Sequence, residues 1–227
     1  MKDLKREVAR MALDYLAPDQ TIGLGAGATI SYLAEMIHLE IPFKETLKFV
    51  TPSVATLDVL NKYSLTATDP SILKKIDIYL DSCDQVDANL NAFKSGGGIH
   101  TKEKFFASMA SEFILLADQS KLVPGLDTTF PLCIELFSEA EGFVLDHISW
   151  LFPQSSVKIR IDEETNLPIV NDRGNLLADI YFKHLPPLNE LNTVIKTIPG
   201  VIDHSLFYDI ATKVLIAEEN GTRLLEK

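Results

Sequence analysis

The hydrophobic positions in the first half of the chain predict helices and buried strands in alternation. A helical spacing of apolar residues runs over 4–15, with Asp3 placed to cap its start and Pro18 to end it. Further helical patterns cover 29–37, 53–62 and 101–111, and short apolar runs typical of buried strands cover 21–24, 47–50, 76–80 and 113–117. Because strands alternate with helices, we predict an α/β fold: a Rossmann-like, largely parallel sheet with helices on both faces.

The pattern changes after about Thr129. Strand-like runs at 132–136, 157–161 and 176–182 follow one another with few helices between them, and a helix is predicted over 187–197. The apolar run 213–217 is typical of a strand that rejoins the first sheet. We therefore predict an α/β catalytic core domain formed by residues 1–128 and 206–227. Residues 129–205 would form a smaller inserted α+β domain that serves as a lid or in oligomerisation.

Composition limits the classes of partner. The chain has 227 residues, of which 46% are hydrophobic and 23% charged, as in ordinary globular proteins. Its net charge of −11 gives no long-range attraction for nucleic acid or an anionic membrane. No apolar run reaches the ~18 residues of a membrane-spanning helix, and no signal-peptide core follows the N-terminus. We expect a cytoplasmic protein that binds neither nucleic acid nor membranes.

The two cysteines, Cys83 and Cys133, lie far apart and form no CxxC pair. This spacing argues against a disulfide framework and against a zinc ribbon. An anionic ligand of so acidic a chain would have to be held by local donors.

The first candidate for such donors is a glycine loop between a predicted strand and a predicted helix. Its spacing, Gly23-x-Gly25-x-Gly27, lets the backbone approach a phosphate closely, with amide groups and the helix dipole directed at it. The spacing matches neither a dinucleotide-binding motif nor a Walker loop. A tight strand–helix turn without a ligand explains the loop equally well. Thr29 is the only hydroxyl available in it.

An acidic stretch, 81–87, directly follows the predicted strand 76–80. In open α/β sheets, ligands gather beyond the carboxyl ends of strands, where carboxylates can bond sugar hydroxyls or move protons. The alternatives are a solvated acidic turn and a magnesium-like cluster.

A second glycine loop, 94–98, contains three consecutive glycines and begins with Lys94. Three glycines are costly to order, which favours unusual torsions or close ligand approach. Glu103 falls in the first turn of the next helix, where dipole complementarity is the simple explanation and a general base is the functional one. His100 has no partner in the sequence, and we interpret it as structural. Lys121, just after a strand, is a candidate phosphate donor.

Six motifs, in order and at family-like spacing, resemble those of the ribose-5-phosphate isomerase A family. They are Gly25-Ala26-Gly27-Ala28-Thr29 (a GTGST-type loop), Asp81-Ser82-Cys83-Asp84-Gln85 (DGADE-type), Lys94-Ser95-Gly96-Gly97-Gly98 with Lys102-Glu103 (KGGGG-type), Ala117-Asp118-Gln119-Ser120-Lys121 (ADxSK), Asn171-Asp172-Arg173-Gly174-Asn175 (TDNGN-type) and Ile198-Pro199-Gly200-Val201 before Leu206-Phe207. No single motif is specific, but six in register are.

The resemblance implies an aldose–ketose isomerase of the non-oxidative pentose phosphate pathway. Such an enzyme interconverts D-ribose 5-phosphate and D-ribulose 5-phosphate through an enediolate, needs no metal or other cofactor, and works as a homodimer or homotetramer. The catalytic residues carried over are Glu103 as base, Lys94, Asp81 and Asp84. The substrate-binding residues carried over are Lys5, Gly25, Ala26, Gly27, Ala28, Thr29, Ser53, Thr56, Gly96, Gly97 and Lys121.

Several positions depart from the family pattern. Ala26 and Ala28 replace hydroxyl residues of the first loop, Gln85 replaces glutamate, and Ser82 and Cys83 replace glycine and alanine. Each lost hydrogen bond to a charged phosphate would cost about 1.5–3 kcal/mol. Two alternatives therefore stay open: a divergent paralogue acting on another sugar phosphate, and a non-catalytic sugar-phosphate sensor like the domain fused to DeoR-type repressors.

Overall fold

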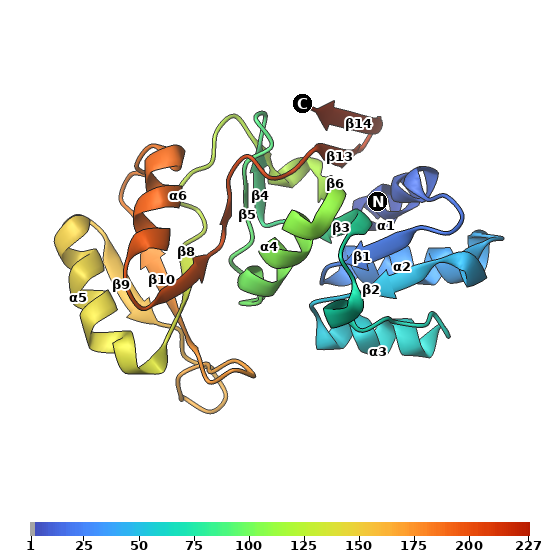
Figure 1. The fold of residues 1–227 in the computed structure, drawn as a ribbon. Coiled ribbons are helices and arrows are strands. Elements are labelled where there is room, and N and C mark those ends of the chain that lie inside the picture. The colour runs from blue at the N-terminus through green and yellow to red at the C-terminus, as the bar shows by residue number, and fades with distance from the viewer. Residues whose placement is uncertain (1–2) are drawn as a thin grey trace.

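The computed structural model describes residues 3–227 and contains a six-stranded main sheet (Figure 1). The strand order is β14-β13-β6-β3-β1-β2. The bounds are β1 (Thr21–Leu24), β2 (Lys48–Val50), β3 (Ile76–Ser82), β6 (Ala110–Asp118), β13 (Lys213–Glu218) and β14 (Gly221–Glu226). All neighbours are parallel except β14, which forms an antiparallel hairpin with β13. The predicted α/β fold with a largely parallel sheet is confirmed.

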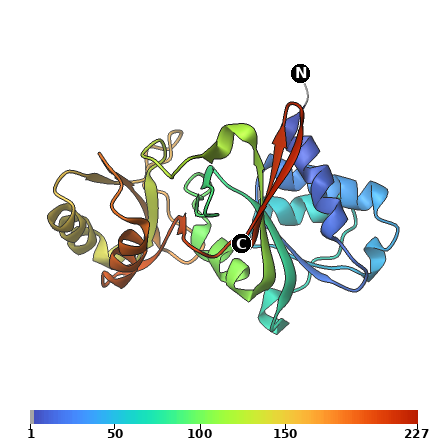
Figure 2. The same cartoon turned by 90° about the horizontal axis from the view of Figure 1, so that it is seen from above.

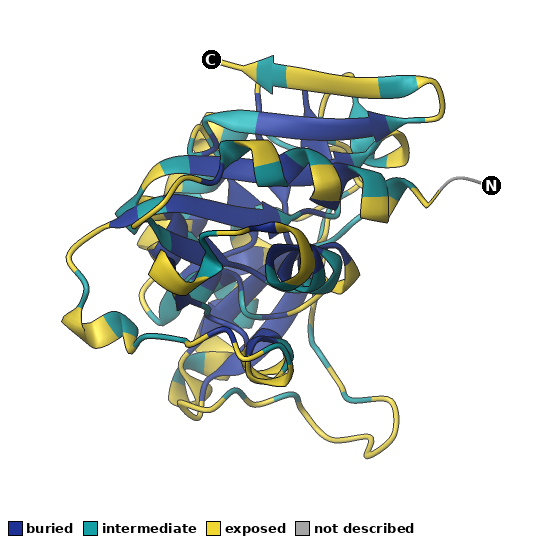
Figure 3. Cartoon of the chain, turned by 90° about the vertical axis from the view of Figure 1, so that its right-hand side faces the viewer, coloured by how far each residue is buried: buried dark blue, intermediate teal, exposed yellow. Residues whose placement is uncertain are grey.

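Alternating side chains on the strands build a core on each face of this sheet. Ile78 and Leu80 of β3 pack in the same core as helices α1 (Leu4–Ala12), α2 (Ala28–Glu40) and α3 (Val54–Lys62). Tyr79, between them, belongs to the opposite core with residues of α4 (His100–Met109). A period of two is what a strand buried on both faces requires. The strands are accordingly dark in the burial view, whereas the edge strand β14 is largely exposed (Figure 3).

Helix ends follow local chemistry. The Asp3 carboxylate accepts hydrogen bonds from the amides of Lys5 and Arg6, which confirms it as the N-cap of α1. Ser53 caps α3 in the same way. The expectation of a helix over 101–111 is wrong at its end, because Ala110 and Glu112 already pair with β3. The chain passes from α4 into β6 without a loop.

The segment after β7 (Leu122–Val123) forms a second, antiparallel sheet in the order β11-β8-β10-β9. Its elements are β8 (Leu132–Leu136), α5 (Glu141–Leu151), β9 (Ser156–Ile159), β10 (Leu176–Tyr181), α6 (Leu188–Thr197) and β11 (Val201–His204). Apolar residues of both helices and all four strands share one core there. Helix α5 is absent from the sequence prediction, since exposed Phe143 and Trp150 obscure its apolar face.

A small third sheet joins the two larger ones, in the order β12-β5-β4-β7. It consists of β4 (Gln85–Asp87), β5 (Ala92–Phe93), β7 and β12 (Leu206–Phe207). Strand β13 then returns to the main sheet, as predicted, and the structure places it beside β6. Seen from above, the second sheet with α5 and α6 lies at one end of the molecule and the main sheet with α1–α3 at the other (Figure 2).

Within residues 3–227, no helix combines the length and apolar character that crossing a membrane requires.

Candidate active site

A pocket of about 230 Å³ opens where β1 and β3 end and α4 begins. The acidic stretch after β3 and both glycine loops contribute to it. Its lining residues are Ala26, Gly27, Ser82, Cys83, Asp84, Lys94, Gly96, Gly97 and Glu103. The structure thus brings three motifs that are far apart in the sequence to the carboxyl edge of the sheet, the edge at which open α/β sheets bind ligands.

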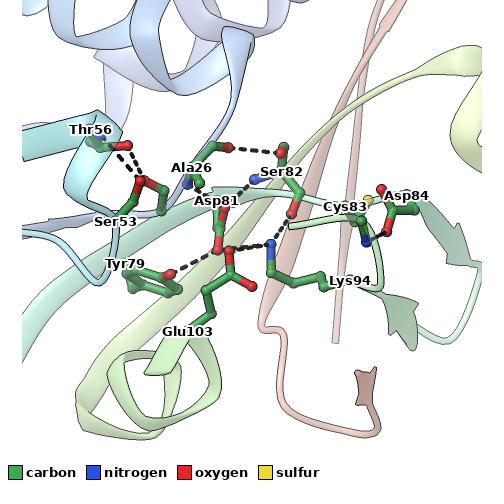
Figure 4. Close-up of polar contacts among 12 residues, drawn as sticks. Ala26, Ser53, Thr56, Tyr79, Asp81, Ser82, Cys83, Asp84, Lys94 and Glu103 are labelled. Carbon is green, nitrogen blue, oxygen red and sulfur yellow. Dashed lines mark hydrogen bonds and ion pairs between the residues drawn. The ribbon is translucent and has the colours of Figure 1, made fainter. Parts of the chain in front are cut away.

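A buried ammonium group lies at the floor of this pocket. Lys94 Nζ is 2.9 Å from Asp81 Oδ2 and 3.4 Å from Glu103 Oε1. It also donates a hydrogen bond of 2.5 Å to the carbonyl oxygen of Ser82. The side chains of Lys94 and Glu103 are each 5% exposed, and that of Asp81 is 0% exposed. Figure 4 shows the three groups directed at one another. Ions this deeply buried persist only when they are paired and hydrogen-bonded.

Both carboxylate oxygens of Asp81 are engaged in hydrogen bonds or ion pairs. Its Oδ1 accepts hydrogen bonds from the amides of Ala26 and Ser82, at 3.1 and 2.8 Å. Its Oδ2 accepts a bond of 2.7 Å from the Tyr79 hydroxyl, in addition to the contact with Lys94. Asp81 does not line the pocket. Its contacts therefore connect the first glycine loop to Lys94.

The first glycine loop packs directly on this carboxylate. A Cβ atom on Gly25 would stand 1.9 Å from Asp81 Cγ and Oδ1, so no larger residue fits. The Gly25 carbonyl accepts a hydrogen bond of 2.6 Å from Thr56 Oγ1, which anchors the loop to α3. Gly27 follows with φ +98°, a torsion that favours glycine, and caps α2. The loop geometry thus depends on glycine at two positions.

The second glycine loop is held by Asp84. Its Oδ2 accepts hydrogen bonds from the amides of Ser95 and Gly96, at 2.6 and 2.9 Å. Among residues 3–227, no group donates a hydrogen bond to Asp84 Oδ1. Because Asp84 lines the pocket, this oxygen is available to a ligand. Gly98 approaches the second sheet, where a Cβ would lie 2.4 Å from Leu177 Cδ1. The acidic stretch therefore fixes both loops, Asp81 the first and Asp84 the second.

Burial shapes the titration of the cluster. Burial, reinforced by the Asp81 carboxylate, raises the pKa of Glu103 above its ordinary range, although Lys94 lies beside it. Burial also lowers the pKa of an ammonium group, but the carboxylates of Asp81 and Glu103 outweigh that effect and raise the pKa of Lys94. The pocket therefore holds a permanent cation beside a carboxyl group that is ready to accept or return a proton near neutral pH.

Other predicted residues lie around the pocket without lining it. Ser53 lines a neighbouring pocket with Thr51 and Lys102, and the Thr56 hydroxyl is committed to the Gly25 carbonyl. Thr29 is buried, with 4% of its surface exposed. Ala28 is exposed in the first turn of α2.

The two predicted phosphate lysines lie outside the pocket wall. Lys121 Nζ donates a hydrogen bond of 2.5 Å to the carbonyl of Cys83, a lining residue. Lys5 is exposed in the first turn of α1, and no hydrogen bond or ion pair among residues 3–227 joins its ammonium to a lining residue. Lys121 thus contacts the pocket wall through Cys83, whereas no such contact in the described part of the chain links Lys5 to a lining residue.

Sequence reasoning missed Tyr79, whose buried hydroxyl orients Asp81. A tyrosine in an apolar run has the pattern of an ordinary core residue, and only its place two residues before the acidic stretch distinguishes it. His100 is fully buried, and burial lowers its pKa to about 3. Its Nε2 lies 3.4 Å from the Asp203 carbonyl, which supports the structural interpretation. Burial raises the pKa of the Cys83 thiol to about 12, so this pocket residue stays protonated.

Among the described residues, no group of three or more His, Cys, Asp or Glu side chains is arranged to hold a metal ion. The cluster instead offers a carboxylate base, a cation beside it and backbone amides at two loops. This set suits proton transfer at a carbon whose neighbouring oxygen becomes negative.

Comparison with known proteins gives consistent matches. The family model described as ribose 5-phosphate isomerase A (phosphoriboisomerase A) matches residues 48–221. A ribose-5-phosphate isomerase A from Pyrococcus furiosus is 32% identical over 231 residues, covering 100% of this chain and 99% of that protein. One from a Synechococcus species is also 32% identical, over 97% of this chain and 95% of its own length.

Solved structures agree with the sequence matches. A D-ribose-5-phosphate isomerase in complex with phospho-erythronic acid superposes with a TM-score of 0.93, at 28% identity, over 100% of both chains. A ribose 5-phosphate isomerase A from Methanocaldococcus jannaschii gives a TM-score of 0.91 at 30% identity, over 99% of both chains. The similarity thus extends over both larger sheets.

Proposed function

The chain belongs to the ribose 5-phosphate isomerase A family, and we propose that the cluster around Lys94 performs the family's reaction. The protein is an aldose–ketose isomerase that interconverts D-ribose 5-phosphate and D-ribulose 5-phosphate. The alternatives of a sensor domain and of a paralogue with another substrate are not favoured by these matches. The roles proposed for individual residues rest on their burial, their contacts and their place in the pocket.

The observation that carries the site assignment is the pairing of Glu103 with Lys94 at the pocket floor, 3.4 Å apart and each 5% exposed. Glu103 is a lining residue, so its carboxylate can reach a bound sugar. Burial raises the pKa of this base toward the working pH, which is the condition for efficient proton transfer in both directions.

The reaction moves two protons. In the open-chain aldose, the Glu103 carboxylate removes the proton from C2, and the electron pair of that bond forms the enediolate. The negative charge on the oxygen faces the Lys94 ammonium, which is already in place and favours the transition state over the ground state. A proton passes from the C2 oxygen to the C1 oxygen, and Glu103 returns its proton to C1. The reverse sequence converts ketose to aldose.

The two aspartates would have different tasks. Asp84 lines the pocket with its Oδ1 available, and we assign to it the orientation of sugar hydroxyls and assistance in ring opening. Asp81 is fully buried, and its contacts support a role in positioning Lys94 rather than in touching the sugar. Asp84 thus stays a proposed catalytic residue, whereas Asp81 is a proposed positioning residue that acts through Lys94.

The phosphate would bind over the first glycine loop and the start of α2. Backbone amides at a helix N-terminus suit an anion, and Gly27 lines the pocket there. The structural neighbour in complex with phospho-erythronic acid supports a phosphorylated sugar derivative as the class of ligand. Thr29, Lys5 and Lys121 are the proposed additional donors, and Gly96 and Gly97 would approach the sugar. Ser53 and Thr56 would support the loop from α3.

We further propose that residues 1–128 and 206–227 act as the catalytic core and 129–205 as a smaller domain that serves as lid or in oligomerisation; residues 1–2 lie outside the described part. Support comes from the apolar core that the second sheet shares with α5 and α6, to which Phe93 and Leu206 of the third sheet also contribute. A cytoplasmic homodimer or homotetramer without a metal cofactor is the assembly that the family resemblance suggests. Light scattering of the purified protein tests the subunit number.

The direct test of the function is a coupled assay that follows conversion of ribose 5-phosphate to ribulose 5-phosphate by the purified chain. Turnover that persists in the presence of a chelator is expected. Absence of conversion, together with measurable binding of ribose 5-phosphate, would contradict the isomerase assignment and favour the sensor. Conversion of a different sugar phosphate at a much higher rate would favour the paralogue.

A further inference from the structure

We infer that Ser82 is a substrate-binding residue whose hydroxyl accepts a hydrogen bond from a secondary hydroxyl of the sugar phosphate, on C3 or C4. The inference rests on the proposed function, because the position of the sugar depends on where the reaction and the phosphate are placed. It adds a specific contact that the glycine of the family pattern cannot make at this position.

The polar atoms of Ser82 form hydrogen bonds within the site, but the acceptor capacity of its hydroxyl oxygen is unused. Its amide donates to Asp81 Oδ1 at 2.8 Å, and its carbonyl accepts from Lys94 Nζ at 2.5 Å. Its hydroxyl donates to the Ala26 carbonyl at 3.1 Å. A serine hydroxyl has one proton and two lone pairs, and the proton is used in that bond. Among residues 3–227, no group donates to Ser82 Oγ, so its acceptor capacity is available to a ligand.

Ser82 also belongs to the wall of the pocket. Ser82 is half-buried and lines the cavity together with Ala26 and Gly27. Its Oγ lies 3.5 Å from the position that a Cβ on Gly27 would occupy. In Figure 4 the Ser82 side chain is directed at Ala26, on the opposite side of the residue from the carbonyl that binds Lys94.

This position identifies the part of the sugar that Ser82 meets. The reacting carbons, C1 and C2, belong beside Glu103 and Lys94, and the phosphate on C5 belongs over the first glycine loop. Ser82 touches both ends, Lys94 through its carbonyl and the loop through its hydroxyl. The groups of the substrate that lie between these ends are the hydroxyls on C3 and C4. A donor there completes the bonding of Ser82 Oγ without breaking its bond to Ala26.

The Ser82 hydroxyl lies next to a loop that lacks two hydroxyl groups of the family pattern, at Ala26 and Ala28. Ala26 and Ala28 offer the ligand no side-chain hydrogen bond. Ser82 places a hydroxyl against the same loop from the end of β3. It would not replace a donor to the phosphate, because its proton is committed, but it would recover part of the binding free energy through the sugar.

The test measures binding and turnover separately. The probe is 4-phospho-D-erythronic acid, which keeps two secondary hydroxyls beside the phosphorylated carbon and needs no chemistry to bind. We expect Ser82→Ala to raise its Kd roughly 3- to 10-fold, the range of a neutral hydrogen bond. The KM for ribose 5-phosphate should rise similarly, while kcat changes less than about twofold.

Ser31→Ala is the matched control. Ser31 Oγ donates to the Gly27 carbonyl at 3.3 Å, so this variant also removes a serine bond to the backbone of the same loop, but Ser31 does not line the pocket. Its Kd should equal that of the unmodified protein. An equal loss in both variants would show that Ser82 merely supports the loop and would overturn the inference.

Two analogues of the probe locate the contact, each lacking one of the two hydroxyls. The Ser82→Ala penalty should disappear with one analogue and persist with the other. A penalty that persists with both, or no penalty with the parent probe, contradicts the inference. If the unmodified protein binds the probe but converts no ribose 5-phosphate, the proposed function fails, whereas the binding comparison still tests Ser82.

Discussion

The two ends of the pocket are built in different ways. At the proposed catalytic end, Lys94, Glu103 and Asp81 are charged side chains, nearly or fully buried, with Lys94 within 3.4 Å of both carboxylates. At the proposed phosphate end, the first glycine loop contributes Ala26 and Gly27, which offer a ligand only backbone hydrogen bonds. Both ends depend on Asp81, which bonds Lys94 with one oxygen and the loop with the other.

The difference shows which departures a site of this kind tolerates. An alanine in the loop removes a donor but leaves the amides and the helix N-terminus that attract an anion. A change in the buried cluster would instead leave a charge without its partner, at a cost of several kcal/mol. The departures at Ala26 and Ala28 fall at the first kind of position. We therefore predict a normal chemical step combined with weak phosphate binding.

The largest expected effect comes from removing the cation. Lys94→Met leaves the fully buried carboxylate of Asp81 without its cation, so the free energy of unfolding at neutral pH should fall by about 3–5 kcal/mol. Urea denaturation measures it. Without Lys94, the carboxyl group of Glu103 stays protonated at neutral pH and ionises only as the pH rises, because burial and Asp81 raise its pKa. Lys94→Met should therefore lose stability relative to the double variant Lys94→Met/Glu103→Gln as the pH is raised. A stability difference between the two variants that does not change with pH would contradict this coupling.

Removing the base should damage the reaction but not binding. Glu103→Gln keeps the shape of the side chain, and kcat should fall by about two orders of magnitude or more with KM almost unchanged. Steady-state kinetics measure both. Glu112→Gln is the control, since it removes a more exposed carboxylate of β6 that pairs with Lys213 of β13 and does not line the pocket, and its kcat should not change. Near-normal turnover of Glu103→Gln would exclude Glu103 as the base.

Restoring a hydroxyl should strengthen the weaker end of the pocket. Ala28 is exposed in the first turn of α2, and Ala28→Ser offers a donor to the phosphate. Because hydrogen bonds to charged groups are worth about 1.5–3 kcal/mol, KM for ribose 5-phosphate should fall about 10-fold with kcat unchanged. Ala55→Ser, the same change on the exposed first turn of α3, should leave KM as it is. An unchanged KM in Ala28→Ser would mean that the phosphate binds elsewhere.

The smallest expected effect concerns pH. Glu103 acts only when ionised, and burial and Asp81 raise its pKa. The kcat/KM of the unmodified protein should therefore decline on acidification at a higher pH than that of an ordinary glutamate, whose pKa is about 4.3. Lys94 should contribute no decline on the alkaline side below its own raised pKa. A pH profile with an acid limb near pH 4 would show that Glu103 is not perturbed in the working enzyme.

Much of the fold can be predicted from the sequence because the main sheet is buried on both faces. Its strands are short apolar runs between helices, and the predicted return of 213–217 to that sheet is confirmed by the pairing of β13 with β6. Helix α5 and strand β14 could not be predicted in this way. Phe143 and Trp150 are apolar but exposed on α5, and Leu224 is an exposed apolar residue of an edge strand. The spacing of apolar residues predicts a helix or strand only where those residues are buried in the core.

Site residues that belong to a sequence motif could be predicted, whereas the burial and the contacts of those residues could not. The motifs predicted that Glu103, Lys94 and Asp84 belong to one site; all three line one pocket, and their roles stay a prediction. That Asp81 is closed off from the pocket, and that Tyr79 orients it, depends on a tertiary contact between neighbours on β3 and the first loop. The positions of Thr56 and Lys121, both bonded to backbone carbonyls, likewise depend on packing between elements distant in the sequence.

The central claim is that Glu103 carries the proton between C2 and C1 beside an intact Lys94. The most direct measurement is conversion of ribose 5-phosphate in D2O, followed by NMR at C1 of the ribulose 5-phosphate formed. We predict that the unmodified protein introduces solvent deuterium at C1, because the carboxyl group of Glu103 exchanges its proton, and that Glu103→Gln introduces almost none. Deuterium incorporation by Glu103→Gln at the rate of the unmodified protein would contradict this claim.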